Sequence, residues 1–556
     1  MANDIQQKLK YWKPGPTIIA WWALALATLL AITPFGIGLI VAFTFESGDV
    51  TWALKSIIWN SFRFTILQAG ISTAIVVIVS PLLGMLLLYS SPSYQRYSSI
   101  VRTLLFCLPS AVVATGIILC WGKHGIGSQL LISLGLSGSV QDWLYSNYTI
   151  ILANVLMNLP FGSLIIYRAI TDIDSRRIKS VKLIGLKPFM IIRSLIWPAI
   201  RPQLYYFGGL NFLLSMSNFG ALRILSGNST VNTLEMSIYQ SLYLNADWRA
   251  AGVFAICHTA CAATISLFFL GPQFLGVKYH LNRAEPSSPD AGSLKIFFPK
   301  SKVLILGSIL ITVIFDLIIA TPIIAILADA IADFDRLIAP QSELRSSILD
   351  SLLQSLNYAI PSALLSTSLA WCLARAYCHY GQLIKPKKAT LILIGIFSLN
   401  FVPSMANAFG FLALRSWIPN FAWDTWPIVI MHALLALPFL TMMALQIYRT
   451  ELASFLHLSQ IAGLPLMKWV INVEWPLMKN KIMLMFVIAL ALSMNETAIV
   501  TMLGAPESPT LTTATIRLMG HYRFGDSAVV SSVLILVTTI ALSTRTNFRS
   551  PNHGIH

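Results

Sequence analysis

The sequence predicts an all-α membrane protein with twelve transmembrane helices, arranged as two parallel six-helix repeats. The 556-residue chain is 56% hydrophobic and only 11% charged, with a mean hydropathy of +0.72, so it has too few charged side chains to cover a water-soluble core. Its apolar stretches reach the roughly 20 residues that a helix needs to cross a bilayer. One long segment also recurs 278 residues further on without a gap, which indicates two structurally equivalent units.

Twelve apolar stretches follow one another along the chain, six in each half. Each is long enough to form one helical span. They cover approximately residues 17–44, 62–90, 100–121, 148–170, 202–222, 250–276, 303–328, 352–380, 389–414, 427–448, 482–503 and 525–544. Because each half has an even number of spans, we expect both halves to enter the membrane in the same direction, as in transporters built from parallel repeats.

The Lys and Arg residues indicate which side of the membrane each loop occupies. Most of them lie in alternate loops, beginning with the segment before the first span, whereas acidic residues outnumber them in the other loops. Loops rich in Lys and Arg stay in the cytoplasm, so we expect both termini to be cytoplasmic. The formal net charge of +16 then follows from orientation, and we expect no nucleic-acid partner.

The duplication divides the chain into two predicted units. The first covers residues 1–276 and the second residues 303–556, and a cytoplasmic linker over 277–302, which contains prolines and charges, joins them. The repeat extends upstream at a spacing of 294 residues, so that Gly116 returns as Gly410. A substrate path is expected between the two units.

The most specific part of the duplication is a loop after the fourth span of each half, over about 171–199 and 450–477. In both copies a glycine that can end one helix precedes a proline that can begin the next, and an aliphatic residue and a Trp-Pro pair follow. These positions are Gly185, Leu195, Trp197 and Pro198 in the first copy, and Gly463, Val473, Trp475 and Pro476 in the second. Two such segments with identical spacing on the cation-rich side favour surfaces for a partner over ordinary solvated hairpins.

This loop resembles the cytoplasmic loop of the inner-membrane permeases of binding-protein-dependent, ATP-driven importers. The family's loop reads Glu-Ala-Ala, three residues, Gly, nine residues, an aliphatic residue, two more residues and Pro. Both copies keep the spacing from Gly to Pro, but Lys179-Ser180-Val181 and His457-Leu458-Ser459 replace Glu-Ala-Ala. The resemblance implies that each loop is a coupling helix seated on an ATP-binding subunit, and therefore two copies of that subunit. It also implies a periplasmic substrate-binding protein and a place in the bacterial inner membrane.

Fusion of two permease units in one chain is similar to two groups within this family, the permeases that import thiamine and those that import ferric iron. The segments Thr233–Leu242 and Asp247–Ala251, and the Val473–Pro476 stretch of the second loop, resemble the thiamine group more. This resemblance implies import of thiamine and leaves open whether its phosphates also pass. Ferric iron remains the alternative substrate.

Two acidic residues lie well inside the predicted spans, and an acid inside a membrane is a candidate functional residue. Glu496, with its neighbour Asn495, occupies the position of Asn218 in the first half. These three residues are the candidates for the substrate path, although Glu496 could instead hold two helices together through hydrogen bonds. For the other acid, Asp316, we expect a packing hydrogen bond to Thr312 or Ser308.

The sequence contains no motif that would make the chain an enzyme. It has no phosphate-binding Gly-x-x-x-x-Gly-Lys-Ser/Thr loop and no His-Glu-x-x-His, so we expect no catalytic residues, cofactor or metal, and expect ATP hydrolysis to occur on the separate subunits. An ion-coupled secondary transporter also has twelve spans in two parallel halves. However, the loop between the second and third spans, Ser91–Tyr97, lacks the basic, Gly- and Asp-containing signature of that class.

Overall fold

The computed structural model describes residues 32–44, 52–122, 125–133, 144, 146–173, 175–184, 187–226, 232–269, 301–335, 343–383, 402–415, 423–448 and 466–547. Within these ranges the chain forms helices and short connections and contains no β-strand. Gly185, Gly463 and nearly all of the predicted linker 277–302 lie outside them.

The first helix that the structure describes spans Ile32–Thr44. The further helices of the first half are α3 (Trp52–Leu87), α4 (Pro92–Cys107), α5 (Ser110–Trp121), α6 (Ile126–Ser133), α8 (Asn147–Thr171), α9 (Ser175–Ile184), α10 (Pro188–Ile191), a π-helical turn (Ile192–Ile196), α11 (Trp197–Met216), α12 (Phe219–Leu225), α13 (Leu234–Tyr243) and α14 (Trp248–Phe269).

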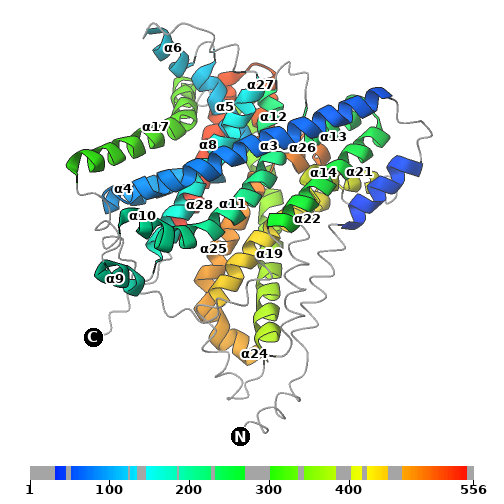
Figure 1. The fold of residues 1–556 in the computed structure, drawn as a ribbon. Helices are drawn as coiled ribbons and strands as arrows, with labels where there is room; N and C mark the ends of the chain where they lie inside the picture. Colours follow the sequence, from blue (N-terminus) through cyan, green and yellow to red (C-terminus); the bar gives the residue numbers. More distant parts are fainter. Residues whose placement is uncertain are drawn as a thin grey trace, which may run out of the picture.

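The second half has counterparts of most of these helices among its described residues. Its helices are α17 (Lys302–Ala332), α19 (Glu343–Leu383), α21 (Ser404–Arg415), α22 (Trp426–Ile447), α24 (Leu466–Trp469), a π-helical turn (Val470–Glu474), α25 (Trp475–Met494), α26 (Ala498–Leu503), α27 (Leu511–Gly520) and α28 (Phe524–Asn547). In Figure 1, α9 and α24 lie toward the lower side of the molecule, and α6 and α27 lie at its upper side.

The predicted fold class, an all-helical membrane protein, is confirmed. Seven of the described helices are long and apolar enough to cross a membrane, and an eighth is added if the bent pair of α4 and α5 counts as one span. Every one of the twelve predicted spans coincides with a helix over at least part of its length. The spans 17–44 and 389–414 lie partly outside the described residues.

Three of the predicted spans are broken rather than continuous. The span predicted over 100–121 bends sharply between α4 and α5, where Pro109 lacks the N–H needed to continue a helix. The spans predicted over 202–222 and 482–503 are interrupted between α11 and α12 and between α25 and α26. Hydropathy alone does not register these breaks, because the residues on both sides of each break are apolar.

The duplication extends to the irregular parts of the helices. The series α10, π-helical turn and α11 begins and ends 278 residues before the series α24, π-helical turn and α25. In each copy the widened turn directly precedes a Trp-Pro pair at the start of the next helix. A proline ring collides with the carbonyl group four residues earlier in a regular helix, and a π-helical turn changes that spacing.

The first helix of each half packs against the other half. In Figure 1, α17 leaves α19, α22 and α25 and lies beside α5. A Cβ atom at Gly116 of α5 would lie 2.5 Å from the carbonyl oxygen of Pro322 in α17, so only glycine allows this approach. A Cβ atom at Gly410, the equivalent of Gly116, would collide with the backbone of Pro34. The two halves therefore exchange equivalent helix contacts.

A buried ion pair reinforces one of these exchanged contacts. Arg102 of α4 lies 2.8 Å from Asp316 of α17 through its Nε atom, and the Tyr94 hydroxyl donates a 2.9 Å hydrogen bond to the same carboxylate. The expected hydrogen bond from Asp316 to Thr312 or Ser308 is wrong, since Thr312 donates to the Ser308 carbonyl instead. Asp316 is satisfied by the other half of the molecule.

Candidate functional sites

The candidate path residues lie where two long helices break. Asn218 stands between α11 and α12, and Asn495 and Glu496 stand between α25 and α26. A helix break exposes backbone groups that a membrane cannot solvate, so side chains must satisfy them. The two breaks have different chemistry although they are equivalent in the duplication.

The break in the first half is held by uncharged amides. The Asn218 amide donates to Asn154 Oδ1, Asn154 donates at 2.8 Å to Gln68 Oε1, and Gln68 donates at 2.8 Å to the carbonyl of Ser215. This chain of hydrogen bonds joins α12, α8, α3 and α11. It is neutral throughout.

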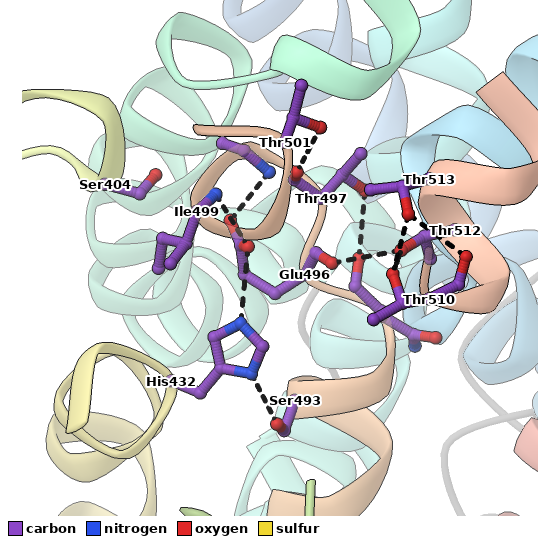
Figure 2. Close-up of polar contacts among 12 residues, drawn as sticks. Ser404, His432, Ser493, Glu496, Thr497, Ile499, Thr501, Thr510, Thr512 and Thr513 are labelled. Atoms are coloured by element: carbon purple, nitrogen blue, oxygen red, sulfur yellow. Dashed lines mark hydrogen bonds and ion pairs between the residues drawn. The ribbon is translucent and has the colours of Figure 1, made fainter. Parts of the chain in front are cut away.

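The break in the second half is held by a carboxylate and an imidazole (Figure 2). Glu496 accepts hydrogen bonds from the backbone N–H groups of Ala498 at 3.0 Å and Ile499 at 2.9 Å, at the start of α26. His432 of α22 lies 3.5 Å from the Glu496 carboxylate through Nε2, and its Nδ1 is 2.6 Å from the Ser493 hydroxyl. His432 is the equivalent of Asn154, so an acid and a base replace two amides.

A second carboxylate from the first half approaches this site. Glu235 of α13 is 1% exposed and contacts the Ser404 hydroxyl of α21 at 3.5 Å. No hydrogen-bond donor among the described residues reaches its Oε2 atom. Burial, and to a lesser degree the nearby Glu496 carboxylate, raise the pKa of Glu235 to about 8. One acid from each half therefore faces the boundary between the halves.

Hydrogen bonds close the boundary between the halves near these acids. The Asn495 amide donates to the carbonyl of Cys107, at the end of α4. The Tyr243 hydroxyl of α13 donates to the carbonyl of Met502 in α26. The structure thus brings Asn495 and Glu496 to the boundary, whereas Asn218 contacts only its own half in the hydrogen bonds described.

The residues of the predicted coupling loops divide into a buried anchor and an exposed face. Leu195 is buried against its own half at 8% exposure, and Val473 packs at the equivalent place. Trp197 and Trp475 are about half exposed, at 49% and 47%. Pro198 and Pro476, which follow them, are also exposed. The two Trp-Pro pairs are equivalent in exposure as well as in sequence.

The first loop presents large apolar side chains that no other described part of the chain covers. Leu183 and Ile184 at the end of α9 are 89% and 69% exposed, and Phe189 and Met190 of α10 are 72% and 53% exposed. An apolar patch flanked by cations such as Arg193 is typical of a surface that binds another protein. We call these four residues the first-loop apolar patch.

The aromatic and basic residues after the fifth span of each half have mixed positions. Arg223 lies over the Tyr239 ring, and Tyr239 stacks on Tyr243, so this group is engaged within the first half. In the second half Tyr522 is 81% exposed and lines an open cavity with Glu343, among other residues. Among the described residues no three His, Cys, Asp or Glu side chains converge as metal ligands.

Sequence reasoning missed His432, Glu235 and the partners of Glu474, a buried residue beside the second Trp-Pro pair. The 278-residue spacing relates Asn154 to His432, so extending the repeat a few residues upstream would have found the first. Glu235 and its contact with Ser404 join segments that are neighbours only in the folded chain. No spacing in the sequence signals that contact.

Comparison with known proteins finds similarity to transport permeases. Residues 80–272 match the family described as binding-protein-dependent transport system inner membrane component. The thiamine transport system permease protein of Brucella abortus is 24% identical over 522 residues, covering 92% of each chain. The corresponding protein of Escherichia coli K12 is 24% identical over 541 residues, covering 94% of this chain and 95% of its own. A putative 2-aminoethylphosphonate transport system permease of Salmonella typhi is 25% identical over 271 residues, covering 47% of this chain and 93% of its own.

The first two similarities run through both halves, and they accompany a helical membrane fold with duplicated loops. The chain is therefore similar to inner membrane components of binding-protein-dependent transport systems, and residues 80–272 match that family.

Proposed function

We propose that this chain is the membrane permease of an ATP-driven importer of thiamine. The observation that carries the proposal is the gap-free repetition of α10, a π-helical turn and a half-exposed Trp-Pro pair as α24, a π-helical turn and a second Trp-Pro pair. Two equivalent projecting surfaces fit two copies of one partner. We take the substrate from the two thiamine transport permeases named above, whose similarity to this chain covers more than nine-tenths of their length.

The partner at these surfaces is an ATP-binding subunit, one copy for each loop. The first-loop apolar patch would lie in the partner's groove, because exposing four large apolar side chains to water is unfavourable. Gly185, Leu195, Trp197 and Pro198 form the first coupling loop, with Leu195 as its buried anchor. Gly463, Val473, Trp475 and Pro476 form the second.

The units 1–276 and 303–556 tilt against each other when the ATP-binding subunits close, and the linker over 277–302 joins them on the cytoplasmic side. A periplasmic binding protein delivers the substrate at the opposite face, near the cavity that Tyr522 lines. Both termini are cytoplasmic in this arrangement, which the distribution of cations favours.

The substrate passes the boundary where Glu496, Asn495 and Glu235 lie, with Asn218 at the equivalent break. Thiamine carries a permanently cationic thiazolium ring, and a carboxylate in a water-poor setting favours a cation strongly. Glu496 is the acid whose side chain retains 12% exposure, so it is the first to meet such a ligand. The neutral amides at Asn218 set no charge preference of their own.

The experiment that tests the substrate uses the periplasmic binding protein that stimulates ATP hydrolysis by the reconstituted complex. Calorimetric titration of that binding protein with thiamine, thiamine phosphates, ferric iron and 2-aminoethylphosphonate gives the ligand directly. Thiamine binding at submicromolar concentration is the expected result. Binding of ferric iron or of the phosphonate, without thiamine, would replace the substrate and keep the importer assignment.

A further inference from the structure

The base of the second coupling loop contains a buried charged cluster. Glu474, the last residue of the π-helical turn before Trp475, is fully buried. Its Oε1 atom accepts a 2.7 Å hydrogen bond from the Trp371 indole of α19 and a second from the Tyr448 hydroxyl at the end of α22. Arg375 of α19 lies 3.5 Å from Oε2. We call Glu474 and these three partners the Glu474 cluster.

The same place in the first half is entirely apolar. The residues equivalent to Glu474, Tyr448 and Trp371 are Ile196, Ile170 and Val77. All three belong to one hydrophobic cluster, in which Ile196 and Ile170 are fully buried. The fold therefore accepts uncharged, apolar residues at the position beneath a coupling loop.

The charged cluster beneath the second loop and the apolar cluster beneath the first constrain their loops differently. Apolar contacts are non-directional, so they hold the first loop in place without fixing its orientation as hydrogen bonds do. A buried carboxylate is costly unless hydrogen bonds of correct geometry compensate it, so the side chain holds its partners in one arrangement. The Glu474 cluster consequently fixes the second loop to α19 in one orientation.

The helix α19 leads from the Glu474 cluster to the candidate path. Its residue Ser355 accepts a 2.9 Å hydrogen bond from the backbone N–H of Leu511, at the start of α27. The next residue, Thr512, donates at 3.2 Å to the carbonyl of Glu496. A movement of the second loop that carries α19 with it reaches Glu496 through these two contacts.

We propose that Glu474 is a positioning residue which locks the second coupling loop to α19, so that the second ATP-binding subunit moves the path through Glu474 while the first loop acts through non-directional apolar contacts. The inference rests on the proposed coupling function of the loops. It makes the two halves of the permease unequal in how they use ATP. The second half then controls Glu496, the acid that faces the substrate path.

The first test replaces residues of the Glu474 cluster by the apolar residues found at the equivalent positions of the first half. The variant Trp371→Val/Tyr448→Ile/Glu474→Ile carries the side chains of the first half at these three positions, so no buried carboxylate is left without partners. Arg375 remains without the carboxylate, but its side chain is 15% exposed and can reach water. The variant should fold and bind ATP-binding subunits. Its uptake per ATP hydrolysed should fall by about fivefold or more, the lower end of typical coupling between sites.

Two single variants separate positioning from structure. Glu474→Gln keeps an oxygen that accepts the hydrogen bond from Trp371 but loses the charge facing Arg375. It should therefore retain much more of the uptake per ATP hydrolysed than the triple variant does. Ile196→Ala, the matched control in the first half, removes buried apolar volume and should lower stability without changing the uptake per ATP. Coupling equal to wild type in the triple variant, or an equal loss in Ile196→Ala, would overturn the inference.

A second measurement needs neither ATP nor substrate. Spin labels are placed at Ile471 on the second loop and Leu364 on α19, both of which are more than half exposed, in the full-length chain with its six native cysteines replaced. Pulsed electron resonance should give one narrow distance with Glu474 present and a broad distribution with Glu474→Ile. An unchanged width contradicts the locking role even if the chain proves to be no importer, so the two failures can be told apart.

Discussion

Arg102 Nε lies 2.8 Å from Asp316 Oδ1, and this buried contact joins α4 of the first half to α17 of the second. A second nitrogen of Arg102 donates at 2.7 Å to the Ser163 hydroxyl of α8. The Arg102 side chain is completely buried. An ion pair in this position links the halves where α17 packs against α4 of the first half.

Removing either member of this pair should destabilise the protein strongly. Asp316→Ala leaves the Arg102 charge buried without its partner, which costs about 3–5 kcal/mol. Thermal unfolding in detergent should show the loss, while the exposed pair of Arg415 and Asp424, 3.5 Å apart, should lose no more than about 1 kcal/mol in Asp424→Ala. The double variant Arg102→Met/Asp316→Leu should recover most of the stability, and a double variant as unstable as the single one would contradict this account of the pair.

Because α5 and α17 approach closely at Gly116, even a methyl side chain at this position should lower the stability of the protein. Gly116→Ala would place a methyl group 2.5 Å from the Pro322 carbonyl oxygen, so the helices must separate at a cost of about 1–3 kcal/mol. Gly307→Ala is the control, because no atom lies within 4 Å of a Cβ atom there. Equal melting temperatures for the two variants would show that α17 can shift without penalty.

The first-loop apolar patch should determine binding of the ATP-binding subunit. Phe189→Asp puts a charge where an apolar contact is proposed, and loss of one central aromatic contact weakens an interface by about tenfold or more. Affinity measured by surface plasmon resonance should show the loss. Tyr148→Asp, at a residue that is 74% exposed outside the predicted loops, should bind normally. Unchanged affinity of Phe189→Asp would remove the patch from the interface.

The two acids at the boundary should contribute unequally to uptake near neutral pH. Glu496→Gln removes a carboxylate from the path and should lower thiamine uptake by about tenfold, the value of one charged hydrogen bond. Glu235→Gln resembles the protonated form that the raised pKa favours at pH 7, so uptake should stay within about twofold of wild type. Initial rates in proteoliposomes measure both. The reverse order of effects would assign the cation to Glu235.

Glu235 also predicts how stability depends on pH. Its carboxyl group, in α13 outside the spanning helices, has a pKa of about 8 when folded and an ordinary value near 4.5 when unfolded. Between these values the unfolded chain has lost the proton and the folded chain keeps it. Stability therefore falls as pH rises from about 5 to about 8, by at most about 1.4 kcal/mol per pH unit. Glu235→Gln should lose this slope in thermal unfolding, and an unchanged slope would assign it to other groups.

The sequence predicted what depends on local pattern. Apolar length located the helices, and a fixed spacing related Trp197 to Trp475 down to the π-helical turn before each. The same pattern missed the break beside Asn218, because Phe219 and its neighbours are as apolar as α11 itself. Hydropathy averages over about 20 residues and does not register a break of two.

The contacts of the buried charges depend on which helices become neighbours. Asp316 pairs with a residue 214 positions earlier, and Glu235 meets Ser404 169 positions later. Local spacing suggested partners within one or two turns for Asp316, but those hydroxyls donate to backbone carbonyl groups instead. Exchange of first helices between halves decides the true partner, and no property of residues 303–328 alone reveals that exchange.

The most direct test of the importer assignment compares energy sources in proteoliposomes that contain the permease, its ATP-binding subunits and its binding protein. The account predicts that labelled thiamine accumulates only when ATP is supplied on the side of the vesicle membrane that carries the ATP-binding subunits. Dissipating the proton gradient should leave the rate of uptake unchanged. Uptake that continues without ATP and stops when the proton gradient is removed would contradict it, and would make the chain a secondary transporter.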